Sequence, residues 1–379
     1  TLLPIAVGMI LINGLNPLGL FFSIGLFYIL SGLYYGVTVP IQPMKVIGAY
    51  ALVTAVDPSK ILAAGAWMAL ILFIIGVTGA MTVIGKYVPK SVVRGVQLST
   101  GILLMAQGIK LMVGTSQFQV LREAAEPFLA IQGVGPVPIG MIIGLAGGVL
   151  TLLLLENRKF PAGLLIVLGG MALGLILGKR EGLHALRLGM YLPEILPFGI
   201  PGAGDFAFAL LVLVLPQLPM TLGNAVIAYA DLSGEYFGEA SKRVTYRSAC
   251  MTMALANVVS FLLGGMPLCH GAGGLAAHYR FGARTAGSNL MIGAIFTALA
   301  IFLGMGSLSI LYLIPMSILG VLLVFAGGQL ALTIIDVRER KDLFVCLLML
   351  GITLASNLAV GFIAGIVVAY ILKSERVSV

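Results

Sequence analysis

The chain has 379 residues, of which 60% are hydrophobic and only 9% are charged, with a formal net charge of +8. Because soluble domains carry roughly 25% charged residues, this composition excludes a soluble globular protein. The continuous apolar runs also argue against a membrane β-barrel, whose strands alternate polar and apolar residues. The sequence therefore predicts an all-α, polytopic protein of the lipid bilayer.

Fourteen apolar segments are predicted along the chain. In chain order they cover 1–17, 18–37, 40–56, 61–86, 95–113, 136–155, 160–178, 205–230, 247–265, 267–281, 286–306, 308–333, 341–358 and 359–373. With a cytoplasmic N-terminus, the cytoplasmic connections hold fifteen of the 22 basic residues and the outer connections hold six. This bias predicts an even number of spans in the cell membrane, with both termini in the cytoplasm.

The stretch 179–204 predicts a connector between two halves, 1–183 and 184–379, of seven segments each. The third segment of each half is too short to cross the bilayer and opens with a proline-bearing stretch, "VTVPIQPMK" in one and "MPLCHGAGG" in the other. An odd number of segments per half gives an inverted repeat. Short, interrupted segments at matching positions of two halves indicate a transporter's binding site at the membrane midplane.

The prolines in the first of these segments predict where a half-helix begins. Pro40 and Pro43 oppose helix in the residues before them, and proline is favoured in a first helical turn. We therefore expect extended chain to Gln42, a half-helix from Pro43, and a second half-helix starting near His270 to Gly274. Two facing helix N-termini offer N–H donors and positive partial charge, an arrangement typical of an anion site.

Three polar side chains at membrane depth are candidates for this site or for structural roles. Lys45 either lines the site and couples a proton, or pairs with a carboxylate and stabilises the bundle. His270 either lines the site and couples a proton, or only caps a helix or bonds a backbone carbonyl. Asn224 is favoured over Asn13 because a predicted break at 216–219 precedes it, although either amide can bond a neighbouring helix.

The sequence offers little for other kinds of chemistry. Cys250, Cys269 and Cys346 have no metal-like spacing, so no metal site, cofactor or disulfide framework is predicted. Basic residues are scattered among loops, so the positive charge predicts topology and not nucleic-acid binding. The spans hold no nucleophile–base motif or paired His and carboxylate cluster, so an enzyme is not expected.

The segments "VPIQPMKVIGAYA", "LPMTLGNAV" and "PLCHGAGGLAAHYRFGARTAGSNL" resemble the MOT-type molybdate transporters of the sulfate permease superfamily, and the resemblance covers essentially the whole chain. It implies a uracil-permease-like fold without a STAS domain. A core domain (1–94 and 205–306) would move against a gate domain (95–178 and 308–373), and a homodimer would form through the gate. The resemblance places the anion against Gln42, Pro43, Met44, Lys45, Asn224, His270, Gly271, Ala272, Gly273 and Gly274.

The predicted function is therefore secondary transport of molybdate into the cell by alternating access. Sulfate and tungstate are alternatives because these tetrahedral dianions share charge and shape. An anion channel on the same fold is another alternative. A neutral nucleobase is disfavoured because its ring N–H groups call for a carboxylate, and neither predicted half-helix carries one.

Overall fold

The structure is a computed structural model, and it describes residues 2–81, 89–155, 157, 161–179 and 187–373. Each of the fourteen predicted segments holds a helix in this structure. The predicted boundary between the halves, at residue 183, lies outside the described residues, as does the predicted end of the fourth segment at residue 86.

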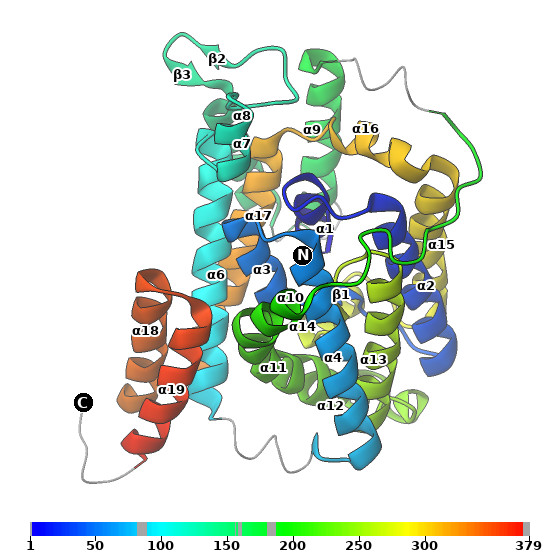
Figure 1. Cartoon of the computed structure of the whole chain (residues 1–379), viewed down its shortest axis with the longest axis vertical. Coiled ribbons are helices and arrows are strands. Elements are labelled where there is room, and N and C mark those ends of the chain that lie inside the picture. Colours follow the sequence, from blue (N-terminus) through cyan, green and yellow to red (C-terminus); the bar gives the residue numbers. More distant parts are fainter. Residues whose placement is uncertain (1, 82–88, 156, 158–160, 180–186, 374–379) are drawn as a thin grey trace.

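The first half is helical apart from a few short strands (Figure 1). Its elements are α1 (Leu2–Leu11), α2 (Pro17–Tyr35), β1 (Gln42–Pro43), α3 (Lys45–Thr54), α4 (Pro58–Thr78), α6 (Lys90–Val113), α7 (Gln117–Leu121), β2 (Gly133–Val134), β3 (Val137–Pro138), α8 (Ile139–Leu154) and α9 (Ala162–Leu177).

The second half has a similar composition of elements. They are α10 (Ala203–Phe208), η2 (Ala209–Val214), α11 (Leu215–Met220), η3 (Thr221–Ile227), α12 (Ala228–Phe237), η4 (Gly238–Ser241), α13 (Tyr246–Leu262), β4 (Leu268–Cys269), α14 (Ala272–Arg280), α15 (Ala286–Leu303), η5 (Gly304–Gly306), α16 (Ser307–Leu311), α17 (Met316–Ala331), η6 (Leu332–Asp336), α18 (Arg340–Ala355) and α19 (Leu358–Leu372).

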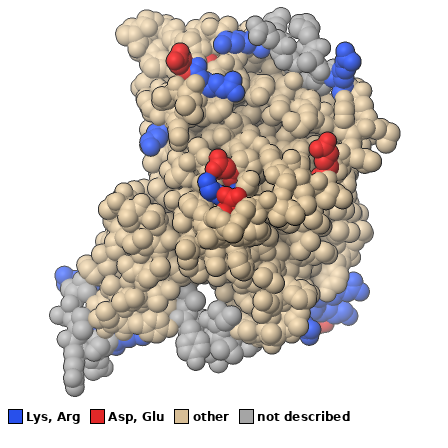
Figure 2. All heavy atoms as spheres, in the orientation of Figure 1, with Lys and Arg blue, Asp and Glu red and all other residues tan. Residues whose placement is uncertain are grey.

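The molecule has the surface of a membrane protein. In the part of the chain that the structure describes, six helical stretches are long and apolar enough to cross a bilayer, and shorter apolar helices accompany them. Figure 2 shows charged side chains near the upper and lower ends of one face, a small mixed cluster in the middle, and a broad uncharged surface elsewhere. This distribution suits a hydrocarbon environment.

Helices of the first half lie beside helices of the second half. The most extensively packed pairs are α6 with α17, α2 with α15, and α4 with α13. Glycines permit two of these approaches: a Cβ on Gly101 would lie 2.6 Å from the Gly327 carbonyl oxygen, and one on Gly25 would lie 2.8 Å from that of Gly293. Small residues are the usual means of close helix packing in membranes.

The predicted break at 216–219 is wrong. Residues 203–237 form one unbroken helical stretch, in which the π-helical segments η2 and η3 flank α11. A wider π-helical turn accommodates a residue that cannot donate a backbone hydrogen bond, and it commonly marks a functional site. The two prolines therefore change the helical pitch without ending the helix.

Candidate functional site

The two short segments predicted to meet do so at the centre of the molecule, where β1 pairs with β4 (Figure 1). The pairing is antiparallel, with Gln42 opposite Cys269 and Pro43 opposite Leu268. The backbone N–H of Met44 extends the ladder by donating to the Pro267 carbonyl over 2.9 Å. Each strand leads directly into a helix, so the strand pair fixes the N-termini of α3 and α14 beside each other.

Two fully buried asparagines satisfy backbone groups that such short strands leave unpaired. Asn257 on α13 accepts from the Leu268 N–H over 3.0 Å and donates to the Leu268 carbonyl over 2.8 Å. Asn289 on α15 binds both backbone groups of Val39 over 2.9 Å in the same way. The sequence analysis did not select either residue, although each is an amide within an otherwise apolar span and could have been found by that feature.

The N-terminus of α3 is capped in part by another helix. The half-helix begins at Lys45, two residues after the predicted start, because Gln42 and Pro43 are held in the strand. Gln217 on α11 accepts from the N–H groups of Val46 and Ile47 over 2.9 and 3.3 Å. This cap, which the sequence analysis missed, removes two of the donors expected to face an anion.

The N-terminus of α14 keeps its donors. Gly271 is its N-cap and supplies no capping side chain, and the first helical hydrogen bond runs from the Leu275 N–H to the Gly271 carbonyl. Within the described residues, the N–H groups of residues 272–274 have no hydrogen-bond partner. A helix N-terminus with free N–H groups favours a negatively charged ligand.

The glycines of this turn face different surroundings. A Cβ on Gly273 would have no heavy atom within 4 Å, so this position faces open space. A Cβ on Gly274 would overlap Gln42 Nε2 and lie 2.8 Å from Pro40 Cβ. A Cβ on Gly271 would lie 2.7 Å from Gln42 Oε1. The backbone of α14 therefore approaches the Gln42 side chain so closely that a Cβ at Gly271 or Gly274 would displace the amide.

Gln42 and Asn224 lie on the same side of Gly271. The Gln42 side chain is 7% exposed, and its Oε1 has no hydrogen-bond partner among the described residues. Asn224 is half-buried on η3, and its Nδ2 would lie 3.4 Å from a Cβ on Gly271. Buried amide groups without a protein partner are uncommon in folded proteins, and a bound water, ion or ligand often satisfies them.

His270 is held by protein groups on both ring nitrogens. Nδ1 lies 3.2 Å from the Pro40 carbonyl oxygen and Nε2 lies 3.0 Å from Thr252 Oγ1. The ring is fully buried and stacks on Tyr229, with centroids 4.8 Å apart. Because a carbonyl only accepts, Nδ1 carries a proton in its contact with Pro40, and Nε2 pairs with the Thr252 hydroxyl. His270 thus ties β4 to the chain before β1.

Lys45 is half-buried and lies within electrostatic range of Cys269. No carboxylate in the described part of the chain lies within 4 Å of its ammonium group. The predicted alternative, a stabilising ion pair, therefore has no partner among these residues. Pro43 and Met44, the remaining predicted contacts, are buried and contribute the strand and its junction with α3.

The arrangement around Gly271 and Gly274 consists of two amide side chains and a helix N-terminus, and Lys45 begins the neighbouring half-helix α3. It has the chemistry to hold a small anion by hydrogen bonds and partial charges. In the described regions, no group of three or more His, Cys, Asp or Glu side chains could hold a metal ion. A cavity of about 1060 Å³ lies elsewhere, between α2, α4 and α13, and its mainly apolar lining does not suit a dianion.

Comparisons with known proteins agree with this chemistry. A family model described as "molybdate transporter of MFS superfamily" matches residues 1–104 and 209–330. Molybdate transporter 1 of Arabidopsis thaliana is 31% identical over 392 residues, covering 96% of this chain and 84% of that protein. The chain belongs to the molybdate transporter family. Molybdate transporter 1 of Chlamydomonas reinhardtii is 29% identical, covering 97% of this chain and 88% of its own length.

The fold of this family member resembles solved anion transporters. The transmembrane domain of the cyanobacterial bicarbonate transporter BicA aligns with a TM-score of 0.67 at 15% identity, covering 97% of this chain and 93% of that domain. Murine Slc26a9 aligns with a TM-score of 0.64 at 14% identity, covering 98% of this chain and 68% of that structure. These similarities establish the polytopic helical fold.

Proposed function

We propose that this chain is a secondary transporter that carries molybdate into the cell across the cytoplasmic membrane. Membership of the molybdate transporter family supports the substrate. The observation that carries the site is the first turn of α14, where unbonded N–H groups lie beside Gln42 and Asn224. The protein performs no chemical reaction in this proposal, because moving the anion requires only binding and a change of access.

In the proposed complex, α14 supplies most of the hydrogen bonds. Its free N–H groups donate to the molybdate oxygens, and Asn224 Nδ2 adds a side-chain donor. Helix α3 contributes fewer hydrogen bonds to the anion than α14, because the N–H groups of Val46 and Ile47 already donate to Gln217. Lys45 adds the one full positive charge and offsets part of the charge on the dianion.

His270 acts as a positioning residue in this proposal. Both of its ring nitrogens bind protein groups, so no nitrogen is left for the anion in this conformation. It fixes β4 and thereby the start of α14. Of the two coupling residues predicted from the sequence, Lys45 is the better placed, since its ammonium has no carboxylate partner among the described residues.

We propose that transport moves a core domain (α1–α4 and α10–α15) against a gate domain (α6–α9 and α16–α19), in a seven-plus-seven inverted repeat with cytoplasmic termini. Reciprocal glycine contacts support the repeat. Cβ atoms on Gly108 and Gly320 would each lie 2.5 Å from the other's carbonyl oxygen, and those on Gly25 and Gly293 would each lie 2.8 Å away. The antiparallel pairing of β1 and β4 also agrees with two halves that are related by a pseudo-two-fold axis in the membrane plane.

The membrane potential opposes uptake. A dianion entering a negative-inside cell costs about 4.6 kcal/mol per 100 mV, from about 2.3 kcal/mol per charge. Accumulation therefore requires co-transported cations, exchange for another anion, or removal of molybdate inside the cell.

The test is uptake of radiolabelled molybdate by proteoliposomes that contain the purified chain, with sulfate, tungstate and uracil as competitors. We expect saturable uptake that excess sulfate and uracil inhibit weakly. Equal inhibition by sulfate would assign a general oxyanion permease, and a non-saturating, voltage-driven current would assign a channel. Uptake no faster than in protein-free liposomes would contradict transport altogether.

A further inference from the structure

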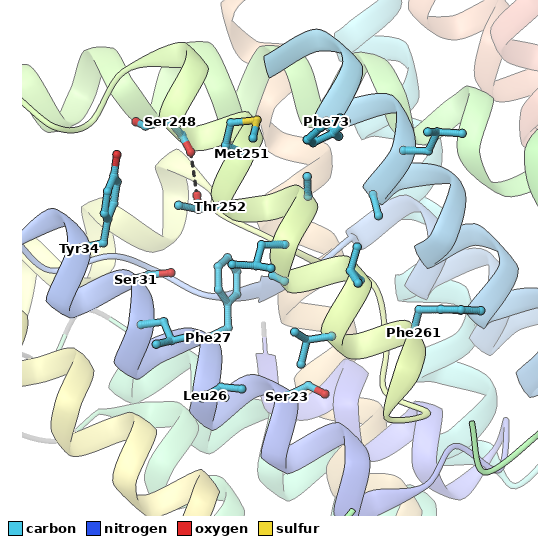
Figure 3. A pocket seen from close by; sticks show the side chains of 18 of the residues that line it. Ser23, Leu26, Phe27, Ser31, Tyr34, Phe73, Ser248, Met251, Thr252 and Phe261 are labelled. Atoms are coloured by element: carbon cyan, nitrogen blue, oxygen red, sulfur yellow. Dashed lines mark hydrogen bonds between the residues drawn. The ribbon is translucent and has the colours of Figure 1, made fainter. Parts of the chain in front are cut away.

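A large groove between α2, α4 and α13 takes no part in the proposed anion site (Figure 3). Its volume is about 1060 Å³, at the upper limit of the roughly 300–1,000 Å³ typical of small-molecule pockets. Most of its lining is apolar, and several members lie on the molecular surface: Phe73 is 49% exposed and Leu255 is 58% exposed. These helices are predicted spans, so the groove faces the hydrocarbon region of the bilayer.

The charged end of the groove lies at the start of α13, where Arg247 stands beside Thr245 and Ser248, while Ser23 and Ser31 lie farther along α2 (Figure 3). Figure 3 shows Tyr34, Ser248 and Thr252 in the upper part of the view, and Leu26 and Phe261 in the lower part. Arg247 lies next to Ser248 in the first turn of α13, and among the described lining residues it is the single charged one, with no carboxylate beside it. Its side chain is exposed, and no acid in the described part of the chain lies within 4 Å of it.

We propose that this groove binds one anionic phospholipid, with its phosphate at Arg247 and an acyl chain between α2, α4 and α13. A long apolar trough with one cation at its end is complementary to an amphipathic anion. The loop at 242–247 is predicted to be cytoplasmic, where anionic lipids attract basic residues. A zwitterionic lipid fits less well because its own ammonium group neutralises the phosphate.

Two lining residues of the groove contact His270, the positioning residue of the proposed anion site. Thr252 lines the groove, and its Oγ1 lies 3.0 Å from His270 Nε2. Phe27 also lines the groove and stacks on the His270 ring with centroids 5.2 Å apart. A lipid chain in the groove therefore packs against the two side chains that hold His270 in front of α14. This functional link, unlike the lipid site itself, rests on the proposed transport function.

Native mass spectrometry of the purified full chain, exposed to equal amounts of phosphatidylglycerol and phosphatidylcholine, tests the site. We expect one retained phosphatidylglycerol, with retention at least tenfold lower in Arg247→Gln. Leu255→Trp, which adds bulk from an exposed position, should lower retention similarly. Arg338→Gln is the matched control, because Arg338 is exposed and does not line the groove. Unfolding temperatures of all three variants are compared with that of the unaltered protein.

Two results would overturn the proposal: equal retention of both lipids, or unchanged retention in both groove variants while they remain folded. Molybdate uptake in liposomes with and without phosphatidylglycerol then tests the link to transport. We expect faster uptake with phosphatidylglycerol, and no such difference for Arg247→Gln. Absence of uptake in every lipid would contradict the transport function but not the lipid site, because lipid retention is measured without molybdate.

Discussion

Replacement of Gly274 by alanine tests the close approach of α14 to Gln42. The added methyl group would overlap Gln42 Nε2 and lie 2.9 Å from Gln42 Cδ, so the amide must move. Gly273→Ala makes the same chemical change one residue earlier in the same turn. It meets no heavy atom within 4 Å, so it isolates the effect of packing from the effect of helix propensity.

The expected difference between the two variants follows from two opposing effects. Alanine is favoured over glycine inside a helix by about 1 kcal/mol, and less in a first turn. Overpacking a buried site costs about 1–3 kcal/mol. Gly273→Ala should therefore be neutral or slightly stabilising. Because both variants gain the same helix propensity, Gly274→Ala should be less stable than Gly273→Ala by the overpacking cost alone, roughly 1–3 kcal/mol.

The assay is thermal unfolding of the two purified variants in one detergent, at one scan rate, without molybdate. We expect Gly274→Ala to unfold at a lower temperature than Gly273→Ala. The double variant Gly274→Ala with Gln42→Ala should recover part of the loss, because the smaller side chain makes room for the methyl group. Equal unfolding temperatures for both single variants would refute the claim that Gln42 packs against Gly274.

Three further predictions concern charge, capping and strand support. Lys45→Gln should weaken molybdate binding roughly 10- to 150-fold, because it removes a charge-assisted contact of about 1.5–3 kcal/mol. Calorimetric titration measures the molybdate Kd of this variant, and an unchanged Kd would show that Lys45 does not contact the anion. Glu126 accepts hydrogen bonds from the first two N–H groups of α17 over 2.9 and 2.8 Å. Glu126→Ala should therefore lower the stability measured by thermal unfolding by about 1–3 kcal/mol and leave the molybdate Kd unchanged. Asn257→Ala leaves both backbone groups of Leu268 unpaired, and hydrogen exchange in the 266–270 segment should accelerate; unaltered exchange would show that the strand pair holds without the amide.

Much of the site architecture follows from local sequence. Pro40, Pro43 and the glycines after His270 predicted two interrupted segments with extended chain and half-helices, because proline and glycine act on the backbone next to them. The starting residues were displaced by up to two positions, since pairing of β1 with β4 holds the chain extended beyond the prolines.

The supporting contacts could not be predicted, because they join residues far apart in the sequence. Gln217 caps a helix 171 residues earlier, and Asn289 binds Val39, in the extended chain before β1, 250 residues earlier. The break expected at 216–219 failed for a different reason. Local propensity predicts that proline ends a helix. In the folded chain, packing around 203–237 keeps the helix continuous, and π-helical turns accommodate the two prolines.

The central claim, that the oxyanion binds in front of α14, is tested most directly by calorimetric titration of molybdate onto the unaltered protein and Gly273→Leu. The leucine side chain enters open space, so the fold should survive, while the space available to the anion is filled. We predict that Gly273→Leu loses molybdate binding at an unchanged unfolding temperature, and that sulfate displaces molybdate only weakly from the unaltered protein. Molybdate binding that persists undiminished in a folded Gly273→Leu would contradict the assignment of the site to this half-helix.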